Sequence, residues 1–358
     1  MIATNVVGEF AAPRSGARGV RITGVGVDIP PTVVTTAELE ELARLRDFGI
    51  EAGWLERVTG VHERHWAEPH VRPSDLAAQA GRQALADARV DPATVDAVLF
   101  TGITKDFFEP ATANVVAAAV GAHHARVLDL MNACNGFIEG IDAADSMIRC
   151  GKARRVLVTT GERVSLVNNF DVRTLEELVR SLAGFMLGDG GGALVLEATD
   201  EPDAGIQARE LRSDPTQWPL AIGGRIRPTT EACECCGSVV DRRFQADGRR
   251  LLEVGLSMLP PVVGAVMERT GWRYEELDLI FCHEAHRRFV ESAVEALGRS
   301  DVASRLWSTV ARFGNTSTVS LPLAMAEATA AGVLVPGGKV LLVAGASGMS
   351  MAAMTVVW

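Results

Sequence analysis

The 358-residue sequence lacks the features that mark several large classes of protein. Its formal net charge is −10, so it carries no excess of basic residues to neutralise phosphates, which argues against nucleic-acid binding. No apolar run reaches the roughly 18 residues that a membrane span needs, so we expect no span. The start has no basic segment followed by an apolar block, so we predict no secretion signal and interpret residues 1–19 as a flexible leader.

Cysteine is scarce as well. The six cysteines have no regular spacing and are too few for a disulfide framework in a chain of this length, which favours a reducing cytoplasm. They are Cys134, Cys150, Cys233, Cys235, Cys236 and Cys282. Cys233 and Cys236, together with His283 and His286, offer a zinc site as an alternative. We disfavour it and expect no metal, because the cysteine pair lies in a separate segment of the chain.

What the sequence does contain is one pattern that occurs twice. Apolar residues at helical spacing over 74–90 are followed by an acidic turn and an apolar strand at 95–100. The same order recurs at 251–272 and 277–282. Strands that are apolar throughout belong to a sheet covered by helices on both faces. We therefore predict a layered α/β fold built by internal duplication, with chance similarity of two generic α/β units as the alternative.

A second correspondence supports the duplication. A basic turn into an apolar strand at 151–162 has a counterpart at 337–347. We accordingly divide the chain into an N-terminal half at 20–200 and a C-terminal half at 251–358. The segment between them, 201–250, holds clusters of proline, glycine and arginine, so we interpret it as an excursion that forms a lid or a wall of a substrate channel.

The strongest local pattern surrounds Cys134. An apolar strand at 127–131 runs into Asn132-Ala133-Cys134-Asn135-Gly136, and a helix follows. Unpaired N–H groups and the dipole at a helix N-terminus favour an anion, so this placement predicts a thiol with a lowered pKa. Cys134 is therefore the candidate nucleophile. The alternative is a buried and inert cysteine, an interpretation that suits Cys150 and Cys282.

A cysteine nucleophile needs polar partners, and two residues of the second half are placed to supply them. His283 directly follows the strand at 277–282, and Asn315 lies in a turn before another helix, where Gly314 permits a tight bend. Such turns gather at the C-terminal edge of a sheet, where sites of α/β proteins form. A Cys-His-Asn set also occurs in papain-like proteases, but their local sequence around the cysteine is absent here.

Taken together, these motifs resemble the thiolase superfamily and in particular the ketoacyl-ACP synthase III type of condensing enzyme. The motifs are NACNGF, CHEAHRR, RFGNTSTVSLP, the glycine-rich LGDGGGALVLE and the final GASGMSMAAMTVVW. The resemblance covers about residues 20–358 and implies the thiolase fold, in which two duplicated halves form a five-layered αβαβα core. It further implies an acyltransferase that needs no cofactor, takes thioesters of acyl-CoA or acyl carrier protein, and works as a homodimer or a heterodimer.

The resemblance also assigns a role to each motif. Cys134 takes an acyl group as a thioester, and His283 and Asn315 donate hydrogen bonds to the thioester oxygen of the second substrate as its α-carbon becomes an enolate. A backbone N–H at Cys134 or Gly348 would hold the oxyanion when the carbanion attacks. Asn135 departs from the small or apolar residues usual after the nucleophile, so we expect it to narrow the acyl pocket or to add a hydrogen bond.

Upstream, the segment 104–112 resembles that of the OleA-type enzymes, which join two acyl chains head to head. In that subfamily the glutamate that matches Glu109 reaches into the partner subunit's site and removes the α-proton, so the second substrate does not have to be a malonyl thioester. The alternative is that Glu109 caps a helix that begins near Pro110.

Two further positions bear on the acyl donor. Trp54 matches the residue that stacks on the CoA adenine in ketoacyl synthases, but Val58 stands where the family has an arginine on the other face of that ring. This departure favours a carrier protein as the donor, with Arg288 as a contact.

The sequence therefore predicts a Claisen condensing enzyme of specialised-metabolite or lipid-derived biosynthesis. Three alternatives stay open. They are decarboxylative condensation with malonyl carrier protein, acyl transfer from Cys134 to an alcohol or amine with His283 as general base, and a non-catalytic subunit of a heterodimer.

Overall fold

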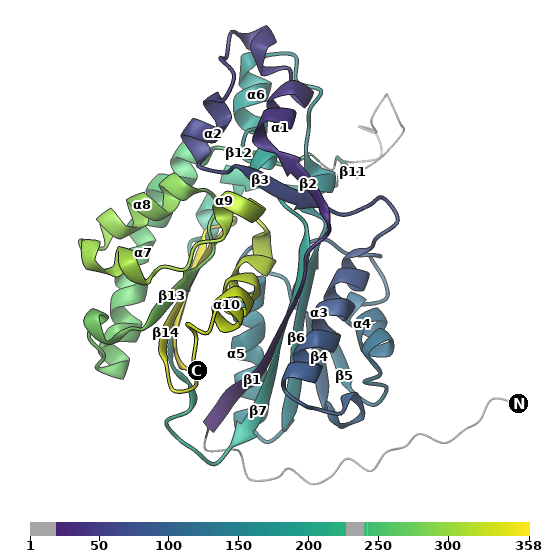
Figure 1. Cartoon of the computed structure of the whole chain (residues 1–358), viewed down its shortest axis with the longest axis vertical. Helices are drawn as coiled ribbons and strands as arrows, with labels where there is room; N and C mark the ends of the chain where they lie inside the picture. The colour runs from purple at the N-terminus through teal and green to yellow at the C-terminus, as the bar shows by residue number, and fades with distance from the viewer. Residues whose placement is uncertain (1–18, 227–239, 242) are drawn as a thin grey trace, which may run out of the picture.

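Figure 1 shows the computed structural model, which describes residues 19–226, 240–241 and 243–358. A hydrogen-bonded sheet of nine strands runs through it in the order β13-β14-β15-β8-β1-β7-β6-β4-β5. The strands are β1 (Gly19–Asp28), β4 (Ala97–Phe100), β5 (Arg126–Asp129), β6 (Arg155–Glu162), β7 (Gly190–Thr199), β8 (Gly205–Ser213), β13 (Leu279–Cys282), β14 (Lys339–Ala346) and β15 (Ser350–Val357).

The sheet consists of two copies of one arrangement. A single residue pair, Val20 with Gly205, joins β1 to β8. On one side of this junction the order is β1-β7-β6-β4-β5, and on the other it is β8-β15-β14-β13. In both, the first three strands pair antiparallel and the fourth pairs parallel with the third. Leu306 forms a parallel bridge to Ile280 of β13 and so takes the place that β5 has beside β4. The topology confirms the predicted duplication.

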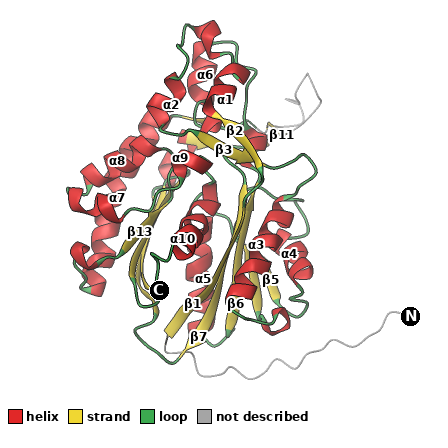
Figure 2. Ribbon diagram, viewed as in Figure 1, coloured by secondary structure: helices red, strands yellow, loops and turns green. Residues whose placement is uncertain are grey.

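Helices cover both halves and fill the space between them (Figure 2). α3 (Pro73–Asp87) and α4 (Thr112–Val120) lie on the outer face of the first half, and α7 (Gly248–Thr270) and α8 (Arg287–Ala296) lie on that of the second. α5 (Gly136–Arg149) and α10 (Ser320–Ala330) form the central layer. Each residue of β4 is buried, as a strand covered on both faces requires. This is the predicted five-layered αβαβα fold.

The helix α7 is long and apolar enough to cross a membrane by length and composition alone. In this fold it packs along β8 and β15, where its buried residues include Val254, Val262, Val263 and Val266. It thus holds the place that α3 has in the first half, which is that of a helix covering a sheet.

One predicted boundary is wrong. The segment 201–250, expected to be an excursion, contains β8, and β8 pairs along its length with β15. The second half of the fold therefore starts near Gly205, because the sequence GIQARELRS forms a strand although it is far more polar than the strands on which the prediction relied. Cys233, Cys235 and Cys236 lie outside the described residues, as do residues 1–18 of the predicted leader.

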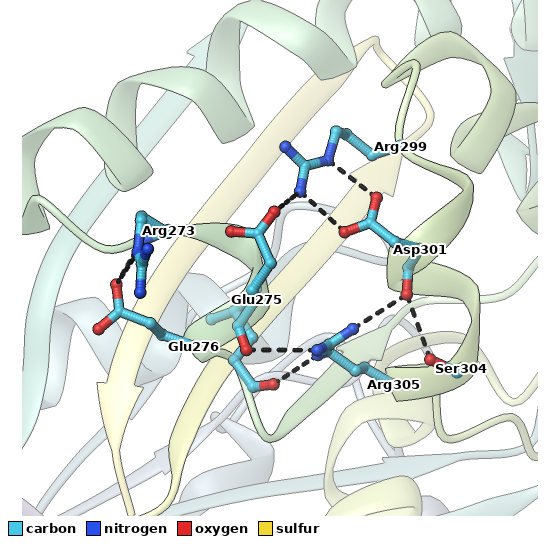
Figure 3. Close-up of polar contacts among 8 residues, drawn as sticks. Arg273, Glu275, Glu276, Arg299, Asp301, Ser304 and Arg305 are labelled. Carbon is cyan, nitrogen blue, oxygen red and sulfur yellow. Dashed lines mark hydrogen bonds and ion pairs between the residues drawn. The ribbon is translucent and has the colours of Figure 1, made fainter.

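A surface network fixes the chain beside β13 (Figure 3). Arg299 forms ion pairs with Glu275 and Asp301. The Arg305 guanidinium donates hydrogen bonds to the backbone carbonyls of Leu277 and Glu275 at 2.8 and 3.2 Å. These contacts join η7 (Tyr274–Glu276) to η8 (Ser300–Arg305), so they hold the following residue, Leu306, against β13. From there the chain continues toward Asn315.

The smaller elements gather at the end of the molecule that is uppermost in Figure 1. They are β2 (Thr32–Thr35), α1 (Thr36–Leu42), α2 (Trp54–Thr59), β3 (Glu63–Trp66), α6 (Leu175–Ser181), β9 (Ala221–Ile222), β10 (Arg225–Ile226), β11 (Val240–Asp241), β12 (Gln245–Ala246) and α9 (Val310–Phe313).

Candidate active site

Cys134 lies in a tight turn between β5 and α5. The Asn135 N–H donates to the Asn132 carbonyl at 3.0 Å, and the Gly136 N–H donates to that of Ala133 at 2.9 Å. A Cβ at position 136 would lie 2.4 Å from the Thr101 carbonyl oxygen, so only glycine fits there. The predicted apolar face of the following helix is buried: Phe137, Ile138, Ile141, Ala144 and Ile148. This packing fixes the turn and leaves Cys134 half-buried.

His283 and Asn315 come from the second half. His283 directly follows β13 and is buried, with 7% of its surface exposed. Asn315 follows α9 and Gly314, which has a φ of 66°. A Cβ at position 314 would lie 2.4 Å from the Met186 carbonyl oxygen, to which the Asn315 N–H donates at 2.7 Å. Glycine is therefore needed for the close approach that holds this turn in front of η9 (Ser317–Val319) and α10.

Ser317, which the sequence prediction missed, brings these three residues together. Its hydroxyl donates to Cys134 Sγ at 3.7 Å, and its N–H donates to Asn315 Oδ1 at 2.9 Å. Its carbonyl accepts from Ser320 Oγ at 2.9 Å, and that Oγ lies 3.1 Å from His283 Nδ1. The predicted cysteine, histidine and asparagine thus surround one serine. The only indication of Ser317 in the sequence was that it stands two residues after Asn315, within the same motif.

Burial dominates the chemistry of the free thiol. It raises the pKa of Cys134 to about 11, whereas the hydrogen bond from Ser317 lowers this pKa and the charge of Glu162 raises it further. The prediction that the position before α5 lowers the pKa of this thiol is therefore wrong, because desolvation of the thiolate outweighs the donors that face it. In the free protein, Cys134 is a neutral thiol at neutral pH.

Burial also keeps His283 uncharged. It lowers the pKa of His283 to about 4, against the opposing effect of a hydrogen bond with the Ser317 backbone. If the Ser320 hydroxyl donates to the Ser317 carbonyl, it accepts from His283 Nδ1, and Nε2 is a base. If it donates to Nδ1 instead, the ring proton is on Nε2, and Nε2 is a donor. Asn315 Oδ1 is engaged by Ser317, and within the part of the chain that the structure describes Nδ2 has no partner. The side chain is therefore oriented to donate.

Glu162 is a second residue that the sequence prediction did not single out. Its fully buried carboxylate accepts from the N–H groups of Ile103 and Thr104 at 3.0 and 3.1 Å. It also accepts from the hydroxyls of Thr104 and Thr318 at 2.9 and 2.6 Å. Burial raises the pKa of Glu162 in spite of these donors. Because Thr318 follows Ser317 and Thr104 begins the segment with Glu109, Glu162 fixes both segments to the end of β6.

Glu109 lies in the exposed loop between β4 and α4. The helix begins at Thr112, and the N–H groups of Thr112 and Ala113 donate to the Asp129 carboxylate at 3.0 and 2.9 Å. The alternative prediction, in which Glu109 caps this helix, is therefore wrong, because Asp129 already occupies the helix N-terminus. Phe108 beside it is 91% exposed.

Trp54 and Arg288 lie on α2 and α8, and these two helices contact each other. Trp54 begins α2 and is half-buried, while Arg288 is exposed and its Nη2 donates to the Arg57 carbonyl at 3.5 Å. His286, named above as a candidate zinc ligand, caps α8 by accepting the Phe289 N–H at 3.2 Å. The two candidate donor-binding residues thus share one surface.

Asn135 contacts the second half at Ser350, two residues from Gly348. Asn135 is fully buried, and its Nδ2 donates to Ser350 Oγ at 2.8 Å, which is the added hydrogen bond that was one of two expectations for this residue. Ser350 begins β15, two residues after Gly348, whose φ is 83°. The turn that carries Gly348 is therefore held against the turn that carries Cys134.

Cys150 and Cys282 are the other cysteines within the described ranges, and neither takes part in the hydrogen bonds around Ser317. Among the described residues, no group of three or more histidine, cysteine and acidic side chains could hold a metal ion. Burial raises the pKa of Cys282 well above its usual value, as expected for an inert thiol. Cys150, predicted to be buried, is exposed, because it lies at the end of α5 beyond the apolar face of that helix.

Comparison with known proteins gives a consistent result. Residues 128–215 match the family model of 3-oxoacyl-(acyl-carrier-protein) synthase III, and residues 267–358 match the model of its C-terminal part. Beta-ketoacyl-(acyl-carrier-protein) synthase III 3 from Streptomyces coelicolor is 34% identical over 341 residues, which cover 94% of this chain and 96% of that protein. The synthase III from Roseiflexus castenholzii is 32% identical over 342 residues, which cover 94% and 97%.

Solved structures show the same fold. Cerulenin-bound OleA from Xanthomonas campestris has a TM-score of 0.86 and 28% identity, over 97% of this chain and 100% of that one. The 3-oxoacyl-(acyl-carrier-protein) synthase III from Pseudomonas aeruginosa has a TM-score of 0.83 and 28% identity, over 95% and 98%.

Proposed function

We propose that this chain, which belongs to the 3-oxoacyl-(acyl-carrier-protein) synthase III family, joins two acyl groups through a thioester on Cys134. Its relatives identify it as an acyl-thioester condensing enzyme of the acyltransferase class. The observation that carries the assignment of residues is the convergence of Cys134, His283 and Asn315 on Ser317.

In the first half-reaction, the Cys134 sulfur attacks the carbonyl carbon of an acyl-CoA or an acyl carrier protein thioester. The new S–C bond forms, the C–S bond of the donor breaks, and the thiol proton leaves with the departing thiol. Because burial keeps the free thiol protonated, the site has to stabilise charge while the attack proceeds. We assign this to the backbone N–H of Cys134 or Gly348 at the oxyanion and to the Ser317 hydroxyl at the sulfur.

In the second half-reaction, the neutral His283 ring and the Asn315 amide donate hydrogen bonds to the thioester oxygen of the second substrate. These donors stabilise the enolate that forms at its α-carbon, and the carbanion attacks the Cys134 thioester. The new C–C bond forms, the S–C bond to Cys134 breaks, and the released thiolate takes up a proton, which restores the thiol. No metal or cofactor enters either step of this proposal. A donor thioester would approach along α2 and α8, where Trp54 and Arg288 offer an aromatic face and a cation.

We assign removal of the α-proton to Glu109 of a second copy of the chain. A carboxylate is needed there because no carbon dioxide leaves to generate the carbanion. Three observations support the assignment. Glu109 is exposed, Asp129 rather than Glu109 caps α4, and the exposed apolar side chains of Phe107, Phe108 and Met131 lie next to the edge strand β5. Covering this surface with a second copy would form a dimer and bring Glu109 to a neighbouring site.

Decarboxylative condensation with malonyl carrier protein is the second candidate. It is favoured by the relatives named beta-ketoacyl-(acyl-carrier-protein) synthase III, whose names specify a carrier-protein product. In that reaction the loss of carbon dioxide forms the carbanion, so Glu109 is not needed. For either reaction we infer a cytoplasmic enzyme, since Cys134, Cys150 and Cys282 are free thiols.

An assay series with the purified protein separates these reactions. The protein is offered an acyl-CoA alone, then acyl-CoA with malonyl carrier protein, and then acyl-CoA with a hydroxyl acceptor. We expect a β-keto product from acyl-CoA alone, and we expect Glu109→Gln to lower its rate by about 10²–10⁴-fold while acylation of Cys134 continues.

The matched control is Glu295→Gln. Glu295 is exposed like Glu109 but lies on α8, and its substitution should leave every rate unchanged. A β-keto product that still forms from acyl-CoA alone at the wild-type rate in Glu109→Gln rules out the base assignment. A product that requires malonyl carrier protein establishes the second candidate instead.

A further inference from the structure

Asn135, the residue after the nucleophile, starts a directed chain of hydrogen bonds across the two halves. Its Nδ2 donates to Ser350 Oγ at 2.8 Å. The Ser350 hydroxyl donates in turn to Asn132 Oδ1 at 3.5 Å, and Asn132 Nδ2 donates to Glu139 Oε1 at 2.9 Å. The chain ends on a carboxylate, so each donor is polarised by the next acceptor. Its members lie on the turn before α5, on α5 itself and at the start of β15.

The same asparagine also carries a cost. Asn135 is fully buried, and its Oδ1 has no hydrogen-bond partner within the described residues. A buried acceptor without a donor destabilises a fold, and an apolar residue at this position would have no such atom. The unpartnered Oδ1 offsets the stability that the Asn135–Ser350 hydrogen bond adds to the fold. Because Asn135 is next to Cys134, we explain this hydrogen bond by the place in which it holds Ser350.

The Asn135–Ser350 hydrogen bond positions the turn between β14 and β15. Ser350 pairs with Ala346, so residues 347–349 form the turn between them. Gly348 and Met349 both have left-handed φ values, 83° and 45°. Met349 has a side chain that disfavours this conformation, so the turn needs fixed anchors. Two hydrogen bonds anchor it. Asp214, in the second half, donates its N–H to the Met349 carbonyl at 2.7 Å, and Asn135, in the first half, donates to Ser350.

We propose that Asn135 is a positioning residue that acts through Ser350 to hold the Gly348 N–H over the thioester carbonyl on Cys134. The inference rests on the proposed function, in which that N–H receives the oxyanion. Acyl transfer then depends on the Asn135–Ser350 hydrogen bond, because negative charge builds on the carbonyl oxygen while the S–C bond forms. Alkylation of the same sulfur does not depend on it, because displacement of iodide from iodoacetamide places no charge on a carbonyl oxygen at the reacting carbon.

The test compares these two reactions of one thiol in the full-length protein. Acylation of Cys134 by acyl-CoA and its alkylation by iodoacetamide are timed by intact-protein mass, with the site mapped on peptides. For Asn135→Ala we expect acylation to slow by about 10- to 100-fold and alkylation to change by less than about twofold. Ser350→Ala, which removes the same hydrogen bond from its other end, should reproduce this split, and the double variant should be no slower than either single one.

Ser347→Ala is the matched control, because this serine lies in the same turn and its hydroxyl makes no hydrogen bond within residues 19–226, 240–241 and 243–358. It should leave both rates unchanged. Equal slowing of acylation and alkylation in Asn135→Ala and Ser350→Ala would overturn the proposal, since the residues would then act on the thiol itself. Unchanged rates with a lower melting temperature would also overturn it, in favour of a purely structural role. Wild-type protein that is alkylated but not acylated at Cys134 would instead refute the proposed function, and this inference with it.

Discussion

The turns that precede α5 and α10 occupy equivalent places in the two halves, yet they carry different chemistry. Each contains a non-glycine residue in the left-handed region, Ala133 with a φ of 45° and Ser317 with a φ of 54°. The first turn presents the thiol of Cys134, and the second presents Asn315 and the Ser317 hydroxyl that contacts this thiol. The two halves thus meet through turns of similar geometry, one of which carries the proposed nucleophile and the other a proposed hydrogen-bond donor.

The largest effect should come from the first turn. Cys134→Ala removes the atom that carries the acyl group, so we expect no acyl mass on the protein and a loss of condensation on the order of 10⁴–10⁶-fold. Intact-protein mass spectrometry after exposure to acyl-CoA is the measurement. Cys150→Ala, at the exposed cysteine, should still be acylated. An acyl adduct on Cys134→Ala would show that the nucleophile lies elsewhere.

His283, a proposed hydrogen-bond donor that follows β13 in the second half, should respond in a different way. His283→Ala removes a donor to the enolate oxygen, so we expect condensation to slow by about 10²–10³-fold while acylation of Cys134 continues. The wild-type condensation rate should show no inflection from His283 between about pH 6 and 8, because the pKa of His283 is about 4 and the ring stays neutral there. Both half-reactions are followed separately, with the exposed His124→Ala as control. If acylation failed together with condensation, His283 would be a base for the first step, and the division of roles between the two halves would not hold.

The smallest effect should come from the contact between the turns. Ser317→Ala removes the hydroxyl that lowers the pKa of Cys134, so the pKa of the thiol should rise further. Alkylation by iodoacetamide at pH 8 should therefore slow by about three- to tenfold, with the pH profile displaced to higher pH. The Ser317 N–H remains, so Asn315 keeps its orientation. A profile that does not move would mean that this contact has no influence on the thiol.

Much of this could be predicted from the sequence. The repeated order of helix and strand predicted the duplication, and β4 and β13 take equivalent places in the two halves of the sheet. The apolar spacing after Gly136 predicted the buried face of α5. Both are local patterns, because a run of a dozen residues already fixes which side chains face a core. The polar strand β8 escaped the prediction because its place in the sheet depends on β15, more than 130 residues away in the chain.

The site was more difficult to predict. Ser317 stands in an identified motif, but its contact with Cys134 joins residues 183 positions apart. Asp129 caps α4, and this finding excludes Glu109 as the cap. It likewise could not be predicted, because it depends on which strand end lies beside which helix in the fold. The pKa of Cys134 could not be derived from its place before a helix, because the extent of burial is set by side chains from both halves.

By itself, the sequence determined the repeated α/β pattern, the strand-to-helix turns and the residue types placed in them, since spacing and turn chemistry are properties of short segments. The tertiary structure alone decided which groups meet at Cys134, how strongly burial raises its pKa, and that Asn135 holds Ser350 across 215 positions of the chain. The physical reason is that desolvation and hydrogen bonding depend on all the atoms around a group, and most of those atoms come from distant parts of the chain.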